Sequence, residues 1–438
     1  MASKYTSAER SSKSLWVSSF KGAVLQTDIP ITIGDKAIPE MTRYCQEEHR
    51  DRFLLVSDEN THAVLGARAE AALKGQGWDV QTVVLSGKEV IADEEYIVQV
   101  LLAAGREKWT YVAVGSGTIT DITRFCSHRT RNNFISLPTA PSVDGYTSIG
   151  APLVVRRVKM TASAQPPVAV FADLPTLCNA PREMIAAGFG DMLGKFTSLA
   201  DWRLGALLWD EPYDVDIARR YRVTLLKCVD EAPEIKRASP KGITSLIGAL
   251  IESGLFMLEF GETRIASGAE HHMSHYWEMK LLQENRRALL HGAKVGLGTV
   301  FAARRYDIVR GLSREEIVQR LANANPPDRK AEIACIRQFY GPQADQVIAV
   351  QRPFLEISES DFEALKQKII DNWDEVQEIA ATVPPAQEIA GLLEQVGGAT
   401  TPQQLGLSDE ETQAALNHGH YLRARFTVAK FGHMMGLW

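Results

Sequence analysis

The sequence is poor in cysteine, and its cysteines form no pattern. Five are present in 438 residues, at positions 45, 126, 178, 228 and 335, and no two of them have CxxC spacing. A disulfide framework and a cysteine-based metal cage are therefore excluded. Scattered reduced thiols are typical of the cytoplasm, and we expect a cytoplasmic protein.

Long hydrophobic runs and a large charge of either sign are also missing. The N-terminus, MASKYTSAERSSKSLW, has no apolar core of a signal peptide, and no later run approaches the ~20 apolar residues of a membrane span. The formal net charge is -6, which gives no electrostatic reason to expect a nucleic-acid partner. We expect no membrane span and no bound nucleic acid.

The composition that remains is that of an ordinary globular protein. Hydrophobic residues make up 45% and charged residues 23% of the chain, which is enough apolar material for a sizeable core. At roughly 150 residues per domain, the length predicts two or three domains.

The first part of the chain alternates short apolar runs with helical patterns. This alternation predicts strand-helix-strand units and a parallel sheet, so we assign residues 1–175 to a nucleotide-binding α/β domain. Apolar spacings of three and four in VLGARAEAALKGQG and EEYIVQVLLAAGREK predict helices that cover the sheet. The predicted strands are RFLLVSD (52–58), DVQTVVLS (79–86), YVAVGSG (111–117), NFISLPT (133–139) and a last one within 166–181.

The pattern changes to long helices after Pro181, a residue that is favourable at a helix start. We therefore predict a mostly helical second domain over residues 176–438. Within it, 326–356 is expected to hold loops and one short helix, and the first ~18 residues of the chain are expected to be a loose lead-in. The predicted helices begin at 182 and continue over 217–231, 243–261, 269–284, 291–310, 314–325, 360–375, 385–396 and 409–418.

A glycine pair follows the third predicted strand. Gly115 and Gly117 would let the backbone approach a phosphate at the start of a helix, but the same GSG sequence also suits a plain tight turn. Asp58 ends the preceding strand, where its carboxylate can accept hydrogen bonds from ribose hydroxyls or cap the next helix. Both alternatives remain open for each feature.

A loop rich in hydroxyl groups follows the next strand, in SLPTAPSVDGYTS (136–148). Thr139, Ser142 and Ser148 would be able to bond the phosphates, ribose or carboxamide of a dinucleotide, and Asp144 would then face the reacting end. An ordinary turn with solvated side chains accounts for the same residues equally well.

Candidate metal ligands lie further along the chain. Asp191, in GDMLGK, is four residues before Lys195, so the two share one face of a predicted helix. His271 and His275 are also four apart, and His291 opens a later helix. One carboxylate and two imidazoles would leave a divalent ion with open positions, as in a catalytic site, and imidazoles favour zinc, nickel or iron over magnesium.

Two further details bear on this site. Three glycines within seven residues, at 188, 190 and 194, each weaken a helix by ~1 kcal/mol relative to alanine, which indicates close approach of a backbone or a ligand. His272 points about 100° away from His271 on a helix and is interpreted as a bystander.

Five motifs follow one another along the chain: AVGSGTITDITRF, SLPTAPSVDGYTSIGAPL, GFGDMLGK, EHHMSHYWEM and LHGAKVGLGT. In this order they resemble the sn-glycerol-1-phosphate dehydrogenase family, in its bacterial arabinose-operon form. That family is grouped with glycerol dehydrogenase, the iron-containing alcohol dehydrogenases and dehydroquinate synthase. The resemblance runs from about residue 20 to the C-terminus and implies a dehydroquinate synthase-like fold, with a Rossmann-like α/β domain, an all-α C-terminal domain and an active site between them.

The resemblance also implies a role for individual residues. It makes Asp191, His271 and His291 the metal ligands, and Asp144, Asp191 and His275 the residues that contact the substrate. Asp58 would bind the adenosine ribose of NAD or NADP. The remaining dinucleotide contacts implied by the resemblance are Gly117, Thr118, Ile119, Thr120, Asp121, Thr139, Ala140, Pro141, Ser142 and Ser148.

The activity implied is metal-dependent, reversible reduction of dihydroxyacetone phosphate to sn-glycerol 1-phosphate by NAD(P)H, in a homodimer with nickel, zinc or iron. Alternatives are a glycerol or other polyol dehydrogenase on an unphosphorylated substrate, a dehydroquinate-synthase-like cyclase and a non-catalytic binding protein. The carboxylate of Asp58 favours NAD, because it repels a 2′-phosphate.

Overall fold

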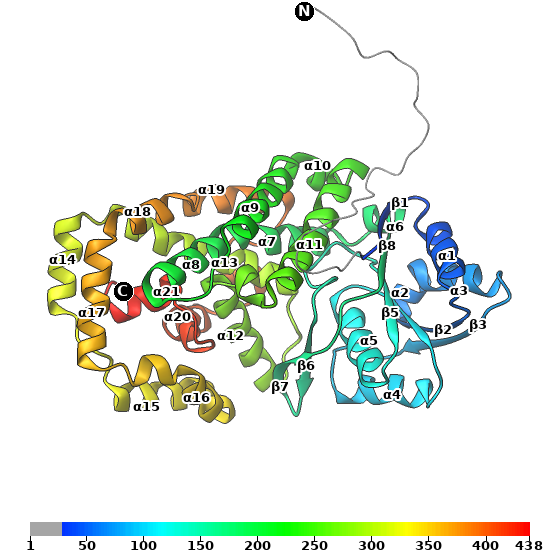
Figure 1. The fold of residues 1–438 in the computed structure, drawn as a ribbon, viewed down its shortest axis with the longest axis horizontal. Coiled ribbons are helices and arrows are strands. Elements are labelled where there is room, and N and C mark those ends of the chain that lie inside the picture. The colour runs from blue at the N-terminus through cyan, green and yellow to red at the C-terminus, as the bar shows by residue number, and fades with distance from the viewer. Residues whose placement is uncertain (1–28) are drawn as a thin grey trace, which may run out of the picture.

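The computed structural model describes residues 29–438, so the predicted loose lead-in over the first ~18 residues lies outside the described residues. A sheet with its helices forms one side of the molecule and a larger helical assembly forms the other (Figure 1). The eight strands of the described residues all lie before Leu174, with helices between several of them, and from Leu174 to the C-terminus, a stretch described throughout, every regular element is helical. The predicted fold class, a Rossmann-like α/β half and a helical half, is confirmed.

The sheet has six parallel strands in the order β1-β8-β5-β4-β2-β3. Successive residues of β2 point to opposite faces: Leu54 and Val56 join one apolar core, while Phe53 and Leu55 join another. Helices cover both faces, as a parallel sheet requires. The strands are β1 Ile31–Gly34, β2 Arg52–Asp58, β3 Asp79–Leu85, β4 Thr110–Val114, β5 Asn133–Leu137 and β8 Ala169–Asp173, and the helices between them are α1 Ala37–Glu47, α2 Glu59–Thr61, η1 His62–Gly66, α3 Ala67–Lys74, α4 Glu94–Ala104 and α5 Gly117–Arg129.

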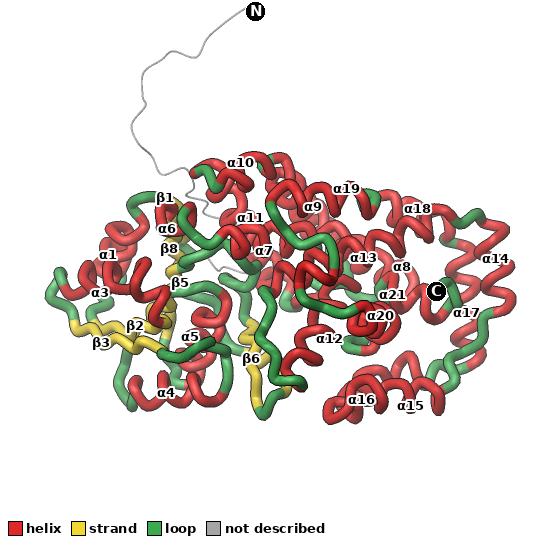
Figure 2. The backbone as a smooth tube through the Cα atoms, turned by 180° about the vertical axis from the view of Figure 1, so that it is seen from behind, coloured by secondary structure: helices red, strands yellow, loops and turns green. Residues whose placement is uncertain are grey.

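Three strands of the N-terminal half were absent from the sequence-based prediction. β1 has only four residues, and β6 (Gly150–Val155) and β7 (Val158–Ser163) form a separate antiparallel hairpin. Its turn holds Arg156 and Arg157 at φ 50° and 63°, where Asn-Gly or Gly-Gly would be the usual sequence signal. The hairpin lies between the sheet and α12 (Ala269–Gln283) in views from both sides (Figures 1 and 2).

The helical half contains the longest elements of the chain. α11 (Pro240–Phe260) has the length and hydropathy of a membrane span, yet 56% of its apolar window is buried inside the protein, which is also typical of a core helix. The absence of a membrane span stays a prediction. The other helices are α6 Leu174–Cys178, α7 Arg182–Leu193, α8 Lys195–Trp209, α9 Val215–Asp230, α10 Ala232–Arg237, η2 Thr263–Ala266, α13 His291–Gly311, α14 Arg314–Asn323, α17 Glu359–Asp371, α18 Trp373–Ala381, α19 Ala386–Val396, η4 Pro402–Leu405, α20 Asp409–His418, η5 Gly419–Tyr421 and α21 Val428–Met434.

The expectation of loops and one short helix over 326–356 was wrong. The segment forms two twelve-residue helices, α15 (Arg329–Tyr340) and α16 (Ala344–Leu355), joined by the short turn η3 (Gly341–Gln343). The prolines that suggested irregular structure lie before the N-cap Asp328, in the joining turn and in the last turn of α16. At these positions proline breaks few helical hydrogen bonds.

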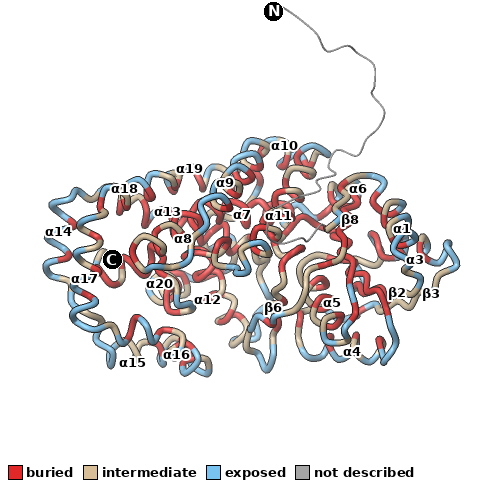
Figure 3. The backbone as a smooth tube through the Cα atoms, viewed as in Figure 1, coloured by how far each residue is buried: buried red, intermediate tan, exposed pale blue. Residues whose placement is uncertain are grey.

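α7 packs against both α13 and α11 in a largely buried part of the helical half (Figure 3). Glycine makes this approach possible. A Cβ atom added at Gly188 would lie 1.8 Å from the carbonyl oxygen of Pro141, and one at Gly292 would lie 1.9 Å from that of Ala187. The predicted reason for these glycines, close approach of another backbone, is confirmed, and it brings the loop after β5 against α7.

Candidate active site

Asp191 lies near the C-terminal end of α7 and is fully buried. Its Oδ1 accepts a hydrogen bond from Lys195 Nζ at 3.2 Å, which confirms that the two side chains lie together. The single helix predicted for both residues was wrong, because Gly194 separates α7 from α8. Its Oδ2 accepts the backbone N–H of Asp144 at 3.0 Å. The carboxylate thereby connects the helical half to the loop that follows β5.

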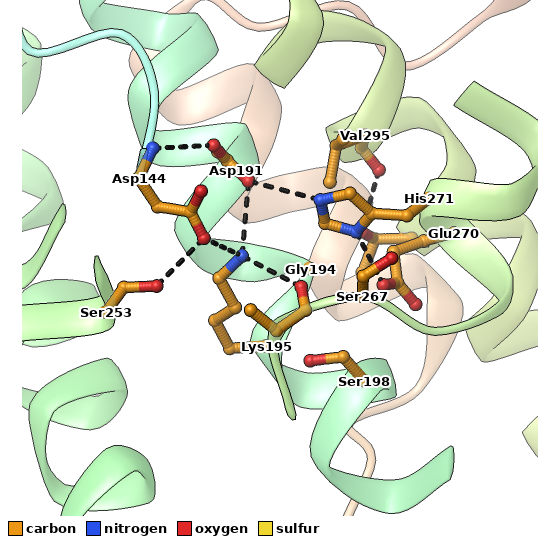
Figure 4. Close-up of polar contacts among 12 residues, drawn as sticks. Asp144, Asp191, Gly194, Lys195, Ser198, Ser253, Ser267, Glu270, His271 and Val295 are labelled. Atoms are coloured by element: carbon orange, nitrogen blue, oxygen red, sulfur yellow. Dashed lines mark hydrogen bonds and ion pairs between the residues drawn. The ribbon is translucent and has the colours of Figure 1, made fainter. Parts of the chain in front are cut away.

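Asp144 is part of the same network (Figure 4). Its Oδ2 accepts hydrogen bonds from Lys195 Nζ at 2.7 Å and from Ser253 Oγ, on α11, at 2.8 Å. Lys195 also donates to the carbonyl oxygen of Ala266 at 3.1 Å. One buried ammonium group therefore holds two carboxylates from distant segments in fixed positions.

The charges of this network determine its protonation. Burial by itself would raise the pKa of Asp191, but the Lys195 ammonium and the neighbouring imidazoles hold that pKa well below its usual range. Burial opposes the charge on Lys195, yet Asp144 and Asp191 raise the pKa of its ammonium well above the ordinary value. Asp191 is therefore ionised at neutral pH and its oxygens are available to a cation.

His271, on α12, faces Asp191 with Nε2 at 3.6 Å from Oδ1. Its other nitrogen, Nδ1, donates to Glu270 Oε1 at 2.8 Å. Glu270 is itself fixed, because it accepts the backbone N–H of Gly268 at 2.6 Å and the hydroxyl of Thr197 at 2.6 Å. A carboxylate behind a histidine sets the tautomer that leaves Nε2 free for a metal.

His291 opens α13 and completes the group. One ligand atom from each of Asp191, His271 and His291 lies within 4.8 Å of the others. The ring of His275 lies beside the group, 5.5 Å from His291 and 6.1 Å from His271 between ring centroids. His272 is buried, and neither of its ring nitrogens has a hydrogen-bond partner among the described residues.

The donor set fits a divalent cation. Two carboxylates, of Asp144 and Asp191, contact the ammonium of Lys195, and a third, of Glu270, contacts His271, so the carboxylates outnumber this ammonium. Burial opposes a charge on His271, but hydrogen bonds to Asp191 and Glu270 raise its pKa, so a proton would compete with a metal ion for this imidazole. Burial lowers the pKa of His291 well below its ordinary value, which keeps that imidazole neutral as a ligand must be.

The residues predicted to hold a dinucleotide lie at the C-terminal edge of the sheet, where nucleotides bind in α/β folds. Gly117 begins α5, whose first N–H groups have no partner within the helix. Ser142 joins Ser116 through their hydroxyl oxygens, and Ser148 Oγ donates to the Gly145 carbonyl at 3.2 Å. Asp58 caps α2 by accepting the Thr61 N–H at 2.8 Å, which bears out the capping alternative; its ribose contact is untested.

Several residues with clear roles in this geometry were not identified from the sequence. Glu270 stood inside a quoted motif, and its position beside a candidate ligand was the available signal. Lys195 was noted only as a neighbour of Asp191. No local signal marked Ser253, because its contact with Asp144 joins residues 109 positions apart.

Comparison with known proteins agrees with this geometry. The iron-containing alcohol dehydrogenase family matches residues 32–181. Over 403 residues the chain is 39% identical to a glycerol-1-phosphate dehydrogenase, NAD(P)+, of Geobacillus thermodenitrificans (strain NG80-2), covering 91% of this chain and 90% of that protein. It is also 39% identical over 412 residues to the enzyme of the same name from Geobacillus stearothermophilus, covering 92% and 93%.

The chain belongs to the glycerol-1-phosphate dehydrogenase family. A solved alcohol dehydrogenase from Oenococcus oeni shares the fold, with a TM-score of 0.59 at 13% identity over 93% of this chain and 97% of that one. Within the glycerol-1-phosphate dehydrogenase fold seen here, the five residues predicted to contact metal and substrate lie together: Asp144, Asp191, His271, His275 and His291.

Replacing Glu270 with glutamine is expected to weaken metal binding about 10-fold to 100-fold, because the neutral amide supports the His271 imidazole less well. Metal affinity is measured by competition with a chelator. Glu284→Gln, at the exposed end of the same helix, is the matched control and is expected to leave the affinity unchanged. Equal affinities for the Glu270→Gln and control proteins would remove Glu270 from the support of the site.

Proposed function

We propose that this protein reduces dihydroxyacetone phosphate to sn-glycerol 1-phosphate, reversibly, with NAD(P)H and one divalent metal. The observation that carries the proposal is the group formed by the buried Asp191 and His271 and the partly buried His291, with Glu270 in contact with His271. The names of its relatives, at 39% identity over most of both chains, support the same reaction.

In this proposal the three ligands hold nickel or zinc, with iron as a further candidate. When bound, the dinucleotide supplies the hydride and the ion polarises the substrate carbonyl as a Lewis acid. The protein's own contribution is to fix positions. Lys195 holds Asp144 and Asp191 on one side of the reacting carbon, and this preorganisation lowers the entropic cost of the reaction.

A proton must reach the new hydroxyl group, and His275 or Asp144, acting through water, is the proposed relay. Burial lowers the pKa of His275 to about 3, so its imidazole is neutral at physiological pH. Nδ1 of His275 faces Glu278 Oε2 at 3.2 Å. This carboxylate accepts a hydrogen bond from Nδ1–H, so Nε2 carries no proton of its own. In the reduction Nε2 is proposed to take a proton from water and pass it to the new hydroxyl group, and in the oxidation to accept the hydroxyl proton.

The dinucleotide is proposed to lie across the C-terminal edge of the sheet. The segment from Gly117 to Asp121 would bind it, with the free N–H groups at the start of α5 directed to the pyrophosphate, and Thr139 to Ser142 together with Ser148 would complete the dinucleotide site. Asp58 would bind the adenosine ribose and favour NAD over NADP. A homodimer and a cytoplasmic location, both expected from the sequence, remain predictions.

The test is NADH oxidation by purified protein of known metal content, with dihydroxyacetone phosphate, dihydroxyacetone or no substrate. The proposal predicts the highest kcat/KM with the phosphate ester and a product identified as sn-glycerol 1-phosphate. If the phosphate ester gave no more rate than dihydroxyacetone, the substrate assignment would fail and a polyol dehydrogenase would become the better account.

A further inference from the structure

Two lysines from different parts of the chain meet at one glutamate next to His275. Lys159, on β7, lies with Nζ 2.7 Å from Glu278 Oε2, and Lys294, on α13, lies with Nζ 3.4 Å from Glu278 Oε1. Glu278 is one turn after His275 on α12 and contacts it as well. We refer to Lys159 and Lys294 as the lysine pair.

Lys294 is the unusual member of the lysine pair. Its side chain is fully buried, and its Nζ has no hydrogen-bond partner among the described residues, although an ammonium group carries three donors. Burial lowers its pKa to about 8. The ion pair with Glu278 Oε1 at 3.4 Å occupies at most one of these donors, so a ligand with oxygen acceptors would satisfy the others.

The lysine pair lies near the proposed metal ligands. Lys294 is three residues after His291, on the same face of α13. His275, which contacts Glu278, lies with its ring 5.5 Å from that of His291. In a triose phosphate only a few bonds separate the carbonyl from the phosphate. A group that binds this phosphate must therefore lie close to the metal ligands. Lys294, which follows His291 by three residues on α13, meets this condition.

The local charge suits an anion. Two ammonium groups face one carboxylate, so the cluster has an excess of one positive charge. Asp121 of α5 is another carboxyl group near Lys159, but Arg124 forms an ion pair with it at 2.9 Å, which offsets its negative charge. The side chains of Lys159, His275 and Glu278 are all partly exposed, at 24%, 23% and 16%, so a solute can reach the cluster.

We propose that Lys159 and Lys294 bind the phosphate group of the substrate. Both would donate charge-assisted hydrogen bonds to the phosphate oxygens, and Glu278 would keep the two ammonium groups in place. This assignment rests on the proposed function and deepens it, because it names the residues that distinguish dihydroxyacetone phosphate from dihydroxyacetone. A pyrophosphate of the dinucleotide shares the same chemistry, and the experiment separates the two sources.

The experiment compares Lys159→Met and Lys294→Met with the wild type in the metal-loaded protein. Each variant is expected to lower kcat/KM for dihydroxyacetone phosphate about 10-fold to 100-fold, mainly through KM, since each removes one charge-assisted contact. The inhibition constant of inorganic phosphate is expected to rise in parallel. The KM for NADH and the rate with dihydroxyacetone are expected to stay unchanged.

Lys280→Met is the matched control, because Lys280 lies on α12 but over the ring of Tyr276, away from Glu278. It is expected to leave all four quantities unchanged. Metal content and melting temperature are recorded for every variant, and Lys159→Met, at a partly exposed side chain, decides the question if Lys294→Met does not fold.

Three results would overturn the assignment. Equal losses with dihydroxyacetone phosphate and dihydroxyacetone would mean that the lysine pair is only structural. A rise in the KM for NADH alone would assign it to the dinucleotide. Unchanged phosphate inhibition would remove it from anion binding altogether. A wild-type protein that does not prefer the phosphate ester would instead refute the proposed function, and phosphate inhibition would still test the lysine pair.

Discussion

The substitution His271→Ala is expected to abolish metal binding and turnover together. His271 is one of the three proposed metal ligands, and Glu270 contacts its Nδ1, which favours the tautomer that leaves Nε2 free on the side of Asp191. Loss of the Lewis acid removes several kcal/mol of transition-state stabilisation, so kcat/KM should fall about 1,000-fold or more. Metal content is measured on the same preparation as the rate.

His272→Leu is the control for this experiment. His272 is the next residue on α12 and is buried without a hydrogen-bond partner among the described residues, so an apolar side chain of similar size is tolerated there. This variant should retain both metal and activity. A His271→Ala protein that kept both would show that His271 is not a ligand.

The substitution Lys195→Met is expected to lower the free energy of unfolding of the metal-free protein by about 3 to 5 kcal/mol. Its ammonium lies 2.7 Å from an oxygen of Asp144 and 3.2 Å from one of Asp191, and removal leaves two buried carboxylates without their shared partner. A divalent ion that binds Asp191 restores positive charge. The loss is therefore expected to be smaller in the metal-loaded protein.

Thermal or urea unfolding with and without metal measures this difference. Lys227→Met, at an exposed position of α9, should change the stability by no more than about 0.5 kcal/mol. Equal destabilisation of the metal-free and metal-loaded proteins by Lys195→Met would contradict the electrostatic account of the site.

The sequence was most informative where local pattern determines structure. The apolar run 52–58 matches β2 residue for residue, because both faces of a parallel strand are buried and the run has no competing helical period. β1 was missed because it has four residues, and the β6–β7 hairpin was missed because arginines occupy the left-handed positions of its turn. In 326–356 the prolines were read as helix breakers, although they flank or end helices.

The candidate site was likewise predictable from the sequence only where its residues lie close together along the chain. The contact between Asp191 and Lys195 followed from their spacing of four, and the structure confirms it, although Gly194 divides the predicted helix in two. The residues alone made Asp191, His271, His275 and His291 candidates for a metal site, but the choice of Asp191, His271 and His291 as the ligands came from the family resemblance, since no local pattern relates Asp191 to segments 80 residues or more away. Contacts such as Ser253 with Asp144, or Lys159 with Glu278 across 119 positions, depend on tertiary packing and had no sequence signal.

The most direct test of the central claim is a metal titration of the stripped protein. Dihydroxyacetone phosphate-dependent NADH oxidation is followed while Zn²⁺ or Ni²⁺ is added to chelator-treated protein. The account predicts no activity at the start and a rise that saturates at about one ion per chain, as expected for a single catalytic site. Full activity in the stripped protein, with no response to added metal, would contradict it.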